Sequence, residues 1–273
     1  MALPQRKAPK LKIAIKGIGT KKPPHETDQL RTSLARFLRQ PLANFRKDAP
    51  LTKAGNSITV GGIKWGVYAF FDYDGEPIYV GQTRESLGSR IGRHLTNQRT
   101  DAVAMAVLDP FEVMTIKVWP LPEHQDVKGD PKKVVAARDA ANHLNALERS
   151  VFLELIEESN FGILNEKDPP EVKSCDPPHS IDGVIIPDEV RELREHPDVR
   201  IARRAQTIAR LTQIIAGRDV QIGLRRALVT QADRLAFLAR ARFEALGGQA
   251  AIESRGEDEP TDYDVEFGQQ ELG

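Results

Sequence analysis

Two runs of β-forming residues dominate residues 58–82, with the dipeptide Asp74–Gly75 between them. An Asp-Gly pair flanked by such runs is a strong signal for a tight β-hairpin turn. A third run of β-forming residues, from Phe111 to Leu121, predicts a further strand. The pattern therefore predicts three strands in the first half of the chain.

The register of the hairpin follows if its turn has two residues. Tyr79 then lies opposite Phe70. Tyr68 likewise lies opposite Gly81, so the two tyrosines are diagonal neighbours on one face. The other face has an ordinary core pattern, made of Val67, Ala69, Ile78 and Val80. Paired tyrosines more often pack than catalyse, so the hairpin alone indicates no function.

Apolar residues at helical spacing mark three other regions. The first, Thr27 to Lys47, predicts one or two short, basic, amphipathic helices around Pro41. They either contact a polyanion or cover one side of the domain that follows. Residues 131–159 predict an Ala/Leu/Glu-rich helix, and residues 188–246 predict two amphipathic helices joined near a glycine.

These patterns divide the chain into five segments. They are a basic N-terminal arm with short helices (1–60), a central domain (61–168), a proline-rich linker (169–187), an arginine-rich helical region (188–248) and an acidic, disordered tail (249–273).

The balance of 39 Lys/Arg and 39 Asp/Glu hides an uneven distribution of charge. Residues 1–60 hold thirteen Lys/Arg against three Asp/Glu, while residues 251–273 hold one against eight. A basic arm suits a polyanionic partner and an acidic end suits a solvated tail, although both also fit simple soluble extensions.

Composition also restricts location and metal chemistry. No run approaches the roughly 20 apolar residues of a membrane span, and the first residues lack the apolar core of a signal peptide. We therefore expect a cytoplasmic protein without a membrane partner. Cys175 is the only cysteine, so an intrachain disulfide is excluded, and Cys175 with His179 supplies only half of a metal site.

The helix predicted after the hairpin carries the first chemical signal. Leu87, Ile91 and Leu95 form an apolar ridge at i, i+4 spacing, and Arg90 and His94 lie along its flank. The nearby Arg84 and Arg93 add positive charge, so the helix suits a phosphate. The alternative is a basic helix edge exposed to water.

Glu148 carries the second signal, because its helical neighbours Leu144, Leu147, Val151 and Phe152 are apolar. Glu154, Glu157 and Glu158 instead share a polar side of the same helix. A carboxylate on an apolar face needs a cation or a hydrogen-bond donor, because its burial alone costs several kcal/mol. A divalent metal or a buried arginine meets this need.

These residues together resemble the GIY-YIG endonuclease domain. The matching elements are Gly66-Val67-Tyr68, Tyr79-Val80-Gly81, Leu87-x-x-Arg90-x-x-x-His94, the helical Glu148 and the loop residue Asn165. The two tyrosines, Tyr68 and Tyr79, are eleven residues apart. The resemblance covers residues 62–168. It departs from the family in having one extra residue between Gly81 and Arg90. The interval from Glu148 to Asn165 is also long, so Glu154 remains a minor alternative to Glu148 as the site carboxylate.

The resemblance implies an α+β fold, in which a small three-stranded antiparallel sheet is flanked by helices. The basic helical arm would precede this domain and the α-helical region would follow it. It also implies hydrolysis of nucleic-acid phosphodiester bonds with one divalent ion, usually Mg²⁺. Glu148 would hold the metal, and Arg90 would donate to the nonbridging phosphate oxygens.

The remaining roles also come from the resemblance. Tyr68 would be the general base toward water, assisted by neighbouring positive charge, with Tyr79 and His94 orienting it or relaying a proton. Asn165 would support the site through hydrogen bonds. Gly81 would allow close approach of backbone or substrate, because it lacks a side chain.

The flanking helices and the activity leave alternatives open. Residues 198–246 hold ten arginines beside an apolar stripe, which fits the seam of a helical hairpin, a homodimer interface or a grip on the DNA backbone. DNA is favoured over RNA as substrate. The alternative functions are a nucleic-acid-binding or assembly protein with an inactive nuclease-like domain, and a phosphodiesterase acting on small nucleotides.

Overall fold

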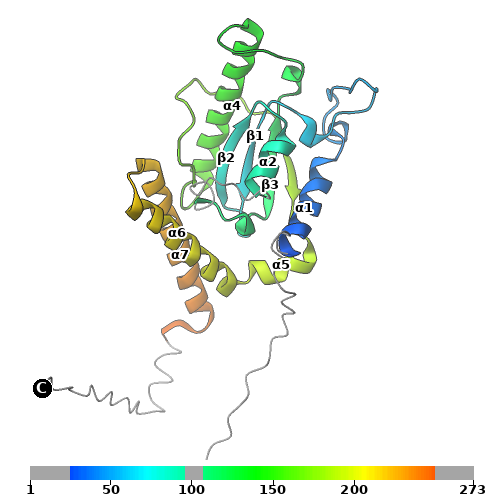
Figure 1. Ribbon diagram of the computed structural model, residues 1–273. Coiled ribbons are helices and arrows are strands. Elements are labelled where there is room, and N and C mark those ends of the chain that lie inside the picture. Colours follow the sequence, from blue (N-terminus) through cyan, green and yellow to red (C-terminus); the bar gives the residue numbers. More distant parts are fainter. Residues whose placement is uncertain (1–24, 96–106, 250–273) are drawn as a thin grey trace, which may run out of the picture.

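A four-stranded antiparallel sheet forms the centre of the protein. The computed structural model describes residues 25–95 and 107–249 (Figure 1). The strands are β1 (Gly66–Phe71), β2 (Pro77–Thr83), β3 (Thr115–Pro120) and β4 (Ile181–Val184), in the order β2-β1-β3-β4. The α+β class and the first three strands are confirmed, whereas the predicted count of three strands is wrong by one.

The fourth strand comes from the range predicted as a proline-rich linker. Its four residues pair with β3, from Val118 opposite Ile181 to Thr115 opposite Val184. So short a strand, with prolines on both sides, carries too little alternation to be recognised from sequence. Gly183 at its centre lies directly against the ring of Phe37, where a larger residue would collide with that ring.

The hairpin has the predicted register along most of its length but a different turn. Tyr68 lies opposite Gly81 and Phe70 lies opposite Tyr79, as expected. The turn, however, has three residues, ending at Gly75 with a φ of 78°. A bulge at Ile78 then restores the register, since Phe71 pairs with Pro77.

The bulge corrects one side-chain assignment. The alternation predicted Ile78 on the face of Val67, Ala69 and Val80. It instead packs in the cluster that contains Tyr68 and Phe70, while Val80 remains with the opposite cluster. An extra residue reverses the side-chain alternation on one side of the bulge, so a period-2 count across it fails.

The long helix α4 (Val135–Glu158) covers one face of the sheet (Figure 1). Its buried Leu144, Leu147 and Val151 pack against Val67 and Val80 from the strands. At about 25 cal/mol per Å² of apolar surface removed from water, these contacts are the main force that holds α4 on the sheet.

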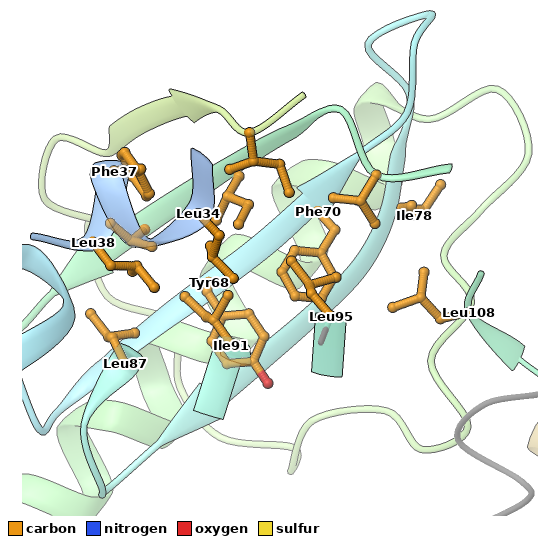
Figure 2. Close-up of a cluster of buried hydrophobic side chains, with 14 of the residues drawn as sticks. Leu34, Phe37, Leu38, Tyr68, Phe70, Ile78, Leu87, Ile91, Leu95 and Leu108 are labelled. Carbon is orange, nitrogen blue, oxygen red and sulfur yellow. The ribbon is translucent and has the colours of Figure 1, made fainter. Parts of the chain in front are cut away.

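Helices α1 (His25–Leu38) and α2 (Leu87–Leu95) cover the other face. Figure 2 shows the rings of Tyr68 and Phe70 surrounded by side chains from both helices, with the Tyr68 hydroxyl directed away from the apolar cluster. Helix α1 buries Leu34 and Phe37, so the basic N-terminal helix covers one side of the central domain. Short 3₁₀ turns lie in the connections between these elements: η1 (Leu42–Asn44), η2 (Val60–Gly62), η3 (Pro110–Glu112) and η4 (Pro122–His124).

The C-terminal region consists of α5 (Asp188–Glu195), α6 (Pro197–Gly217) and α7 (Ile222–Ala245). Helices α6 and α7 lie side by side as a helical hairpin beside the sheet (Figure 1). Leu211 and Leu224 from these helices join the same apolar cluster as the tyrosines. The two helices thus form a hairpin, but the apolar stripe fits its seam only in part, because Leu211 is buried whereas Ala205 is exposed. No helix within 25–95 and 107–249 combines the length and apolar character of a membrane span.

Buried ion pairs attach this helical hairpin to the turn of the β-hairpin. One Asp72 carboxylate oxygen accepts from the backbone N–H groups of Asp74 and Glu76 at 2.9 and 3.1 Å. The other accepts from Arg204 at 2.9 Å and Arg234 at 3.2 Å. Since Arg204 and Arg234 are buried, they hold the fold together and do not present their charge to solvent.

Candidate active site

Two tyrosines and two basic side chains meet on the α2 face of the hairpin. The rings of Tyr68 and Tyr79 lie 6.2 Å apart between centroids, and the His94 ring lies 5.8 Å from Tyr68 and 5.2 Å from Tyr79. The Arg90 Nε–H donates to the Tyr68 hydroxyl at 3.3 Å. The structure therefore brings together the four residues that the sequence placed on neighbouring elements.

The extra residue before α2 does not remove Arg90 from the site. The Ser86 hydroxyl accepts from the Ser89 N–H at 3.2 Å and caps the start of the helix. Leu87 N–H donates to the Ile63 carbonyl at 2.8 Å, which ties the same turn to the segment before β1. Leu87, Ile91 and Leu95 are buried. This seating of α2 turns Arg90 toward Tyr68.

Gly81 is required by the position of Tyr68. A Cβ atom at residue 81 would lie 2.6 Å from the Tyr68 hydroxyl and 2.9 Å from the Tyr79 ring. Both distances are shorter than van der Waals contact. The close approach expected at this glycine is thus made by the Tyr68 phenol of the neighbouring strand.

Glu148 reaches the site from the opposite face of the sheet. Its side chain is buried on α4, and its Oε2 accepts from the Gln82 Nε2–H of β2 at 2.8 Å. The same amide donates to Asn145 Oδ1 at 2.9 Å. Glu154, the alternative carboxylate, is exposed on the same helix. Sequence reasoning missed Gln82, although its place directly after Gly81 marked it as a neighbour of the site.

Burial controls the charge state of this carboxylate. Removal from water raises the pKa of Glu148 to about 7, while the hydrogen bond from Gln82 and the charge of Arg90 act in the opposite direction. Arg90 is affected reciprocally: burial opposes its charge, but Tyr68, Tyr79 and Glu148 raise its pKa overall. Arg90 and Glu148 are therefore parts of one electrostatic site.

The phenol of Tyr68 is strongly perturbed. Burial raises its pKa well above the ordinary value and the nearby Tyr79 adds to this, whereas Arg90 lowers it. Tyr68 is consequently a neutral hydroxyl in the free protein. Because the phenol keeps its proton, Tyr68 can accept a proton from water only if it passes its own proton to another group during the reaction.

The surroundings of Glu148 fit a hard divalent cation. Carboxylate oxygen is the ligand that Mg²⁺ prefers, and Mg²⁺ usually keeps several waters. Within the described part of the chain, the buried Gln82 Oε1 accepts no hydrogen bond, although its amide nitrogen is fully used. Water bound to a cation at Glu148 would supply the missing donor to this oxygen.

The side chain of Asn165 supports the edge strand β2 by forming hydrogen bonds with its backbone. Its Oδ1 accepts from the Val80 N–H at 3.0 Å, and its Nδ2 donates to the Val80 carbonyl at 2.8 Å. These bonds imitate those of a neighbouring strand along the free side of β2. The supporting role expected for Asn165 therefore corresponds to holding the strand that carries Tyr79, Gly81 and Gln82.

Comparison with known proteins agrees with this geometry. Residues 64–125 match the family model described as the GIY-YIG catalytic domain. The matched range contains Tyr68, Tyr79, Arg90 and His94, and it ends before Glu148. No curated protein and no solved structure matches the chain.

Proposed function

Because residues 64–125 form a GIY-YIG catalytic domain, which belongs to a nuclease family, we propose that this chain is a metal-dependent endonuclease that hydrolyses phosphodiester bonds of nucleic acid. DNA is the favoured substrate. The observation that carries the proposal is the cluster of Tyr68, Tyr79 and His94, in which the Arg90 Nε–H donates a hydrogen bond to the Tyr68 hydroxyl. The buried Glu148 adds a carboxylate whose charge acts on Arg90.

The chemistry requires positive charge near the phosphate. In-line attack by water builds negative charge on the nonbridging oxygens, which a guanidinium can stabilise by donating hydrogen bonds to them. Arg90 supplies this group at the end of the tyrosine pair. A divalent ion, with Mg²⁺ favoured, held by Glu148 would stabilise the leaving oxygen. Gln82 positions the carboxylate through the bond to its Oε2.

Proton transfer from water involves the aromatic side chains. Tyr68 accepts the proton of the attacking water as its own proton moves to a neighbouring group. His94 lies close enough to Tyr68 and Tyr79 to receive that proton or to orient the phenols. Approach of Arg90 to the phosphate also changes the bond it makes with Tyr68, so binding and proton transfer are linked.

The proposed substrate, nucleic acid, is a long polyanion, so arginines near the site are candidates for contacts with its backbone. The exposed Arg84 lies in the turn before α2, close to the residues of the site. Several C-terminal arginines are used in ion pairs within the fold, including Arg200 with Asp74 and Arg226 with Asp168. Contacts to the nucleic-acid backbone are therefore expected from α2 and its preceding turn more than from the buried arginines of α6 and α7.

Cleavage assays test the function directly. The purified chain is incubated with supercoiled plasmid, linear DNA and RNA, with Mg²⁺ or with EDTA. We expect metal-dependent nicking, which Arg90→Ala and Glu148→Ala each abolish while circular dichroism stays unchanged.

The matched control is Arg191→Ala. Arg191 is exposed on α5, outside α2 and its preceding turn, and pairs with Glu195, so its loss should preserve cutting. DNA binding by the unaltered protein without any cutting would refute the proposal and favour a binding or assembly module with an inactive nuclease-like domain. Equal cutting by the Arg90→Ala variant would remove this residue from the mechanism.

A further inference from the structure

A second group of metal-ligand side chains lies apart from the candidate active site. His124 in η4 and His143 in α4 face each other, with His124 Nε2 and His143 Nδ1 at 3.0 Å. Glu123 Oε1 lies 3.7 Å from His143 Nδ1. Among the described residues, these three side chains bring their ligand atoms within 4.8 Å of one another. We propose that Glu123, His124 and His143 bind a divalent transition metal of the Zn²⁺ class.

The spacing suits a tetrahedral ion. Zinc–nitrogen and zinc–oxygen distances of about 2.0–2.1 Å place tetrahedral ligand atoms roughly 3.3 Å apart. The separations from His143 Nδ1 to His124 Nε2 and to Glu123 Oε1, 3.0 and 3.7 Å, lie on either side of this value. Small rotations of side chains would therefore complete three positions, and water from the exposed side of Glu123 would fill the fourth.

The ligand-bearing turn is held in place before any metal binds. Gln125, next to His124, accepts from the Lys64 N–H at 3.0 Å and donates to the Gly62 carbonyl at 3.3 Å. The Trp65 ring meets the His124 ring edge-on, with centroids 6.1 Å apart.

The chemistry distinguishes this site from the one at Glu148. Imidazole nitrogen suits Zn²⁺ and related transition metals, whereas Mg²⁺ prefers oxygen ligands. A metal here would join the turn after β3 to α4, five residues before Glu148. Its role would be to fix α4 on the sheet, and the proposal does not depend on nuclease activity.

Zinc titration of the full chain tests the site. After removal of metals with a chelator, calorimetry with Zn²⁺ in excess Mg²⁺ should give one bound ion per chain. His143→Ala and Glu123→Gln should each weaken binding, with a loss of about tenfold or more for the histidine variant. Saturating Zn²⁺ should raise the melting temperature of the unaltered protein by roughly 5 °C.

Two control variants show whether Zn²⁺ binds at these three residues or elsewhere on the chain. His179→Ala removes an exposed histidine elsewhere, and Glu148→Gln removes the proposed Mg²⁺ ligand; both should bind Zn²⁺ as the unaltered protein does. Co²⁺ in place of Zn²⁺ should give the visible absorption of a tetrahedral ion, lost in His143→Ala. Because Glu123 is exposed, Glu123→Gln keeps the test valid if His143→Ala fails to fold.

Two results would overturn the proposal. The first is absence of stoichiometric Zn²⁺ binding, or equal affinity in the unaltered protein, Glu123→Gln and His143→Ala; His124 and His143 would then share only a hydrogen bond. The second is loss of binding in His179→Ala, which would place the ion at a different histidine.

Discussion

Replacing Glu148 by glutamine should stabilise the folded protein at alkaline pH. The carboxylate is only 8% exposed, and its Oε2 accepts from Gln82. The glutamine carbonyl oxygen can accept the same bond without a charge. The substitution therefore removes a buried negative charge while it preserves the shape and the hydrogen bond of the site.

The size of the effect follows from the pKa of about 7, compared with an ordinary value of 4.5. The folded state binds the proton more tightly than the unfolded state, so ionisation costs stability as pH rises from about 4.5 to about 7. For a shift of this size, the Glu148→Gln variant should gain about 2.5 kcal/mol relative to the unaltered protein between about pH 5 and pH 8. Below the unfolded-state pKa the difference disappears.

Urea unfolding measures this gain. The two proteins are compared at both pH values without divalent metal, and the exposed Glu154→Gln serves as the matched control, for which no pH-dependent gain is expected. Adding Mg²⁺ at about pH 8 should stabilise the unaltered protein but not Glu148→Gln, because the cation binds the ionised carboxylate. A Glu148→Gln variant whose relative stability is the same at both pH values would refute the reasoning about burial.

Three further substitutions test other parts of the fold. Gly81→Ala should abolish plasmid nicking and cost about 1–3 kcal/mol in urea unfolding, since the added methyl collides with the buried Tyr68 phenol and the Tyr79 ring. Unchanged nicking would contradict this. Asp72→Asn should lower the free energy of unfolding in urea by about 3–5 kcal/mol, because the buried Arg204 and Arg234 lose their anion. The control Asp48→Asn, at an exposed ion pair, should cost less than about 1 kcal/mol. Equal losses in the two variants would show that the buried ion pairs stabilise the fold no more than an exposed pair does. Asn165→Ala should cost roughly 2 kcal/mol and speed hydrogen exchange in β2, because two backbone groups lose their partners; unaltered exchange would argue against this support of the strand.

Local patterns were enough to predict the hairpin and the face shared by its tyrosines. Strand alternation and the helical spacing of Arg90 and His94 depend only on nearby residues, and the structure reproduces both. The turn length was not predictable to one residue, because Asp-Gly suits both a two-residue turn and a three-residue loop ending at Gly75. The bulge at Ile78 is the geometric consequence of that choice.

Long-range contacts set the rest of the site. Glu148 was recognisable as an unusual carboxylate from its apolar neighbours, but its partner Gln82 lies 66 residues away and no local period connects them. The exposure of Glu154 was likewise decided by how α4 rests on the sheet. Hydrogen bonds between distant side chains depend on the packing of whole elements, which a single sequence does not encode as a pattern.

Local sequence patterns predicted the first three strands, the main helices, the tyrosine face and the set of residues that resembles a nuclease site. Those features rest on side-chain periodicity and on turn chemistry, which act over a few residues. The pairing of β4 with β3 and the burial of Arg204 and Arg234 around Asp72 depend on contacts between distant segments, which no local pattern reveals. An arginine-rich helix looks the same in sequence whether its charges face water or a buried carboxylate. Whether such an arginine is exposed or buried depends on the balance between the cost of removing its charge from water and the gain from pairing with a buried carboxylate, which is set only when the chain folds.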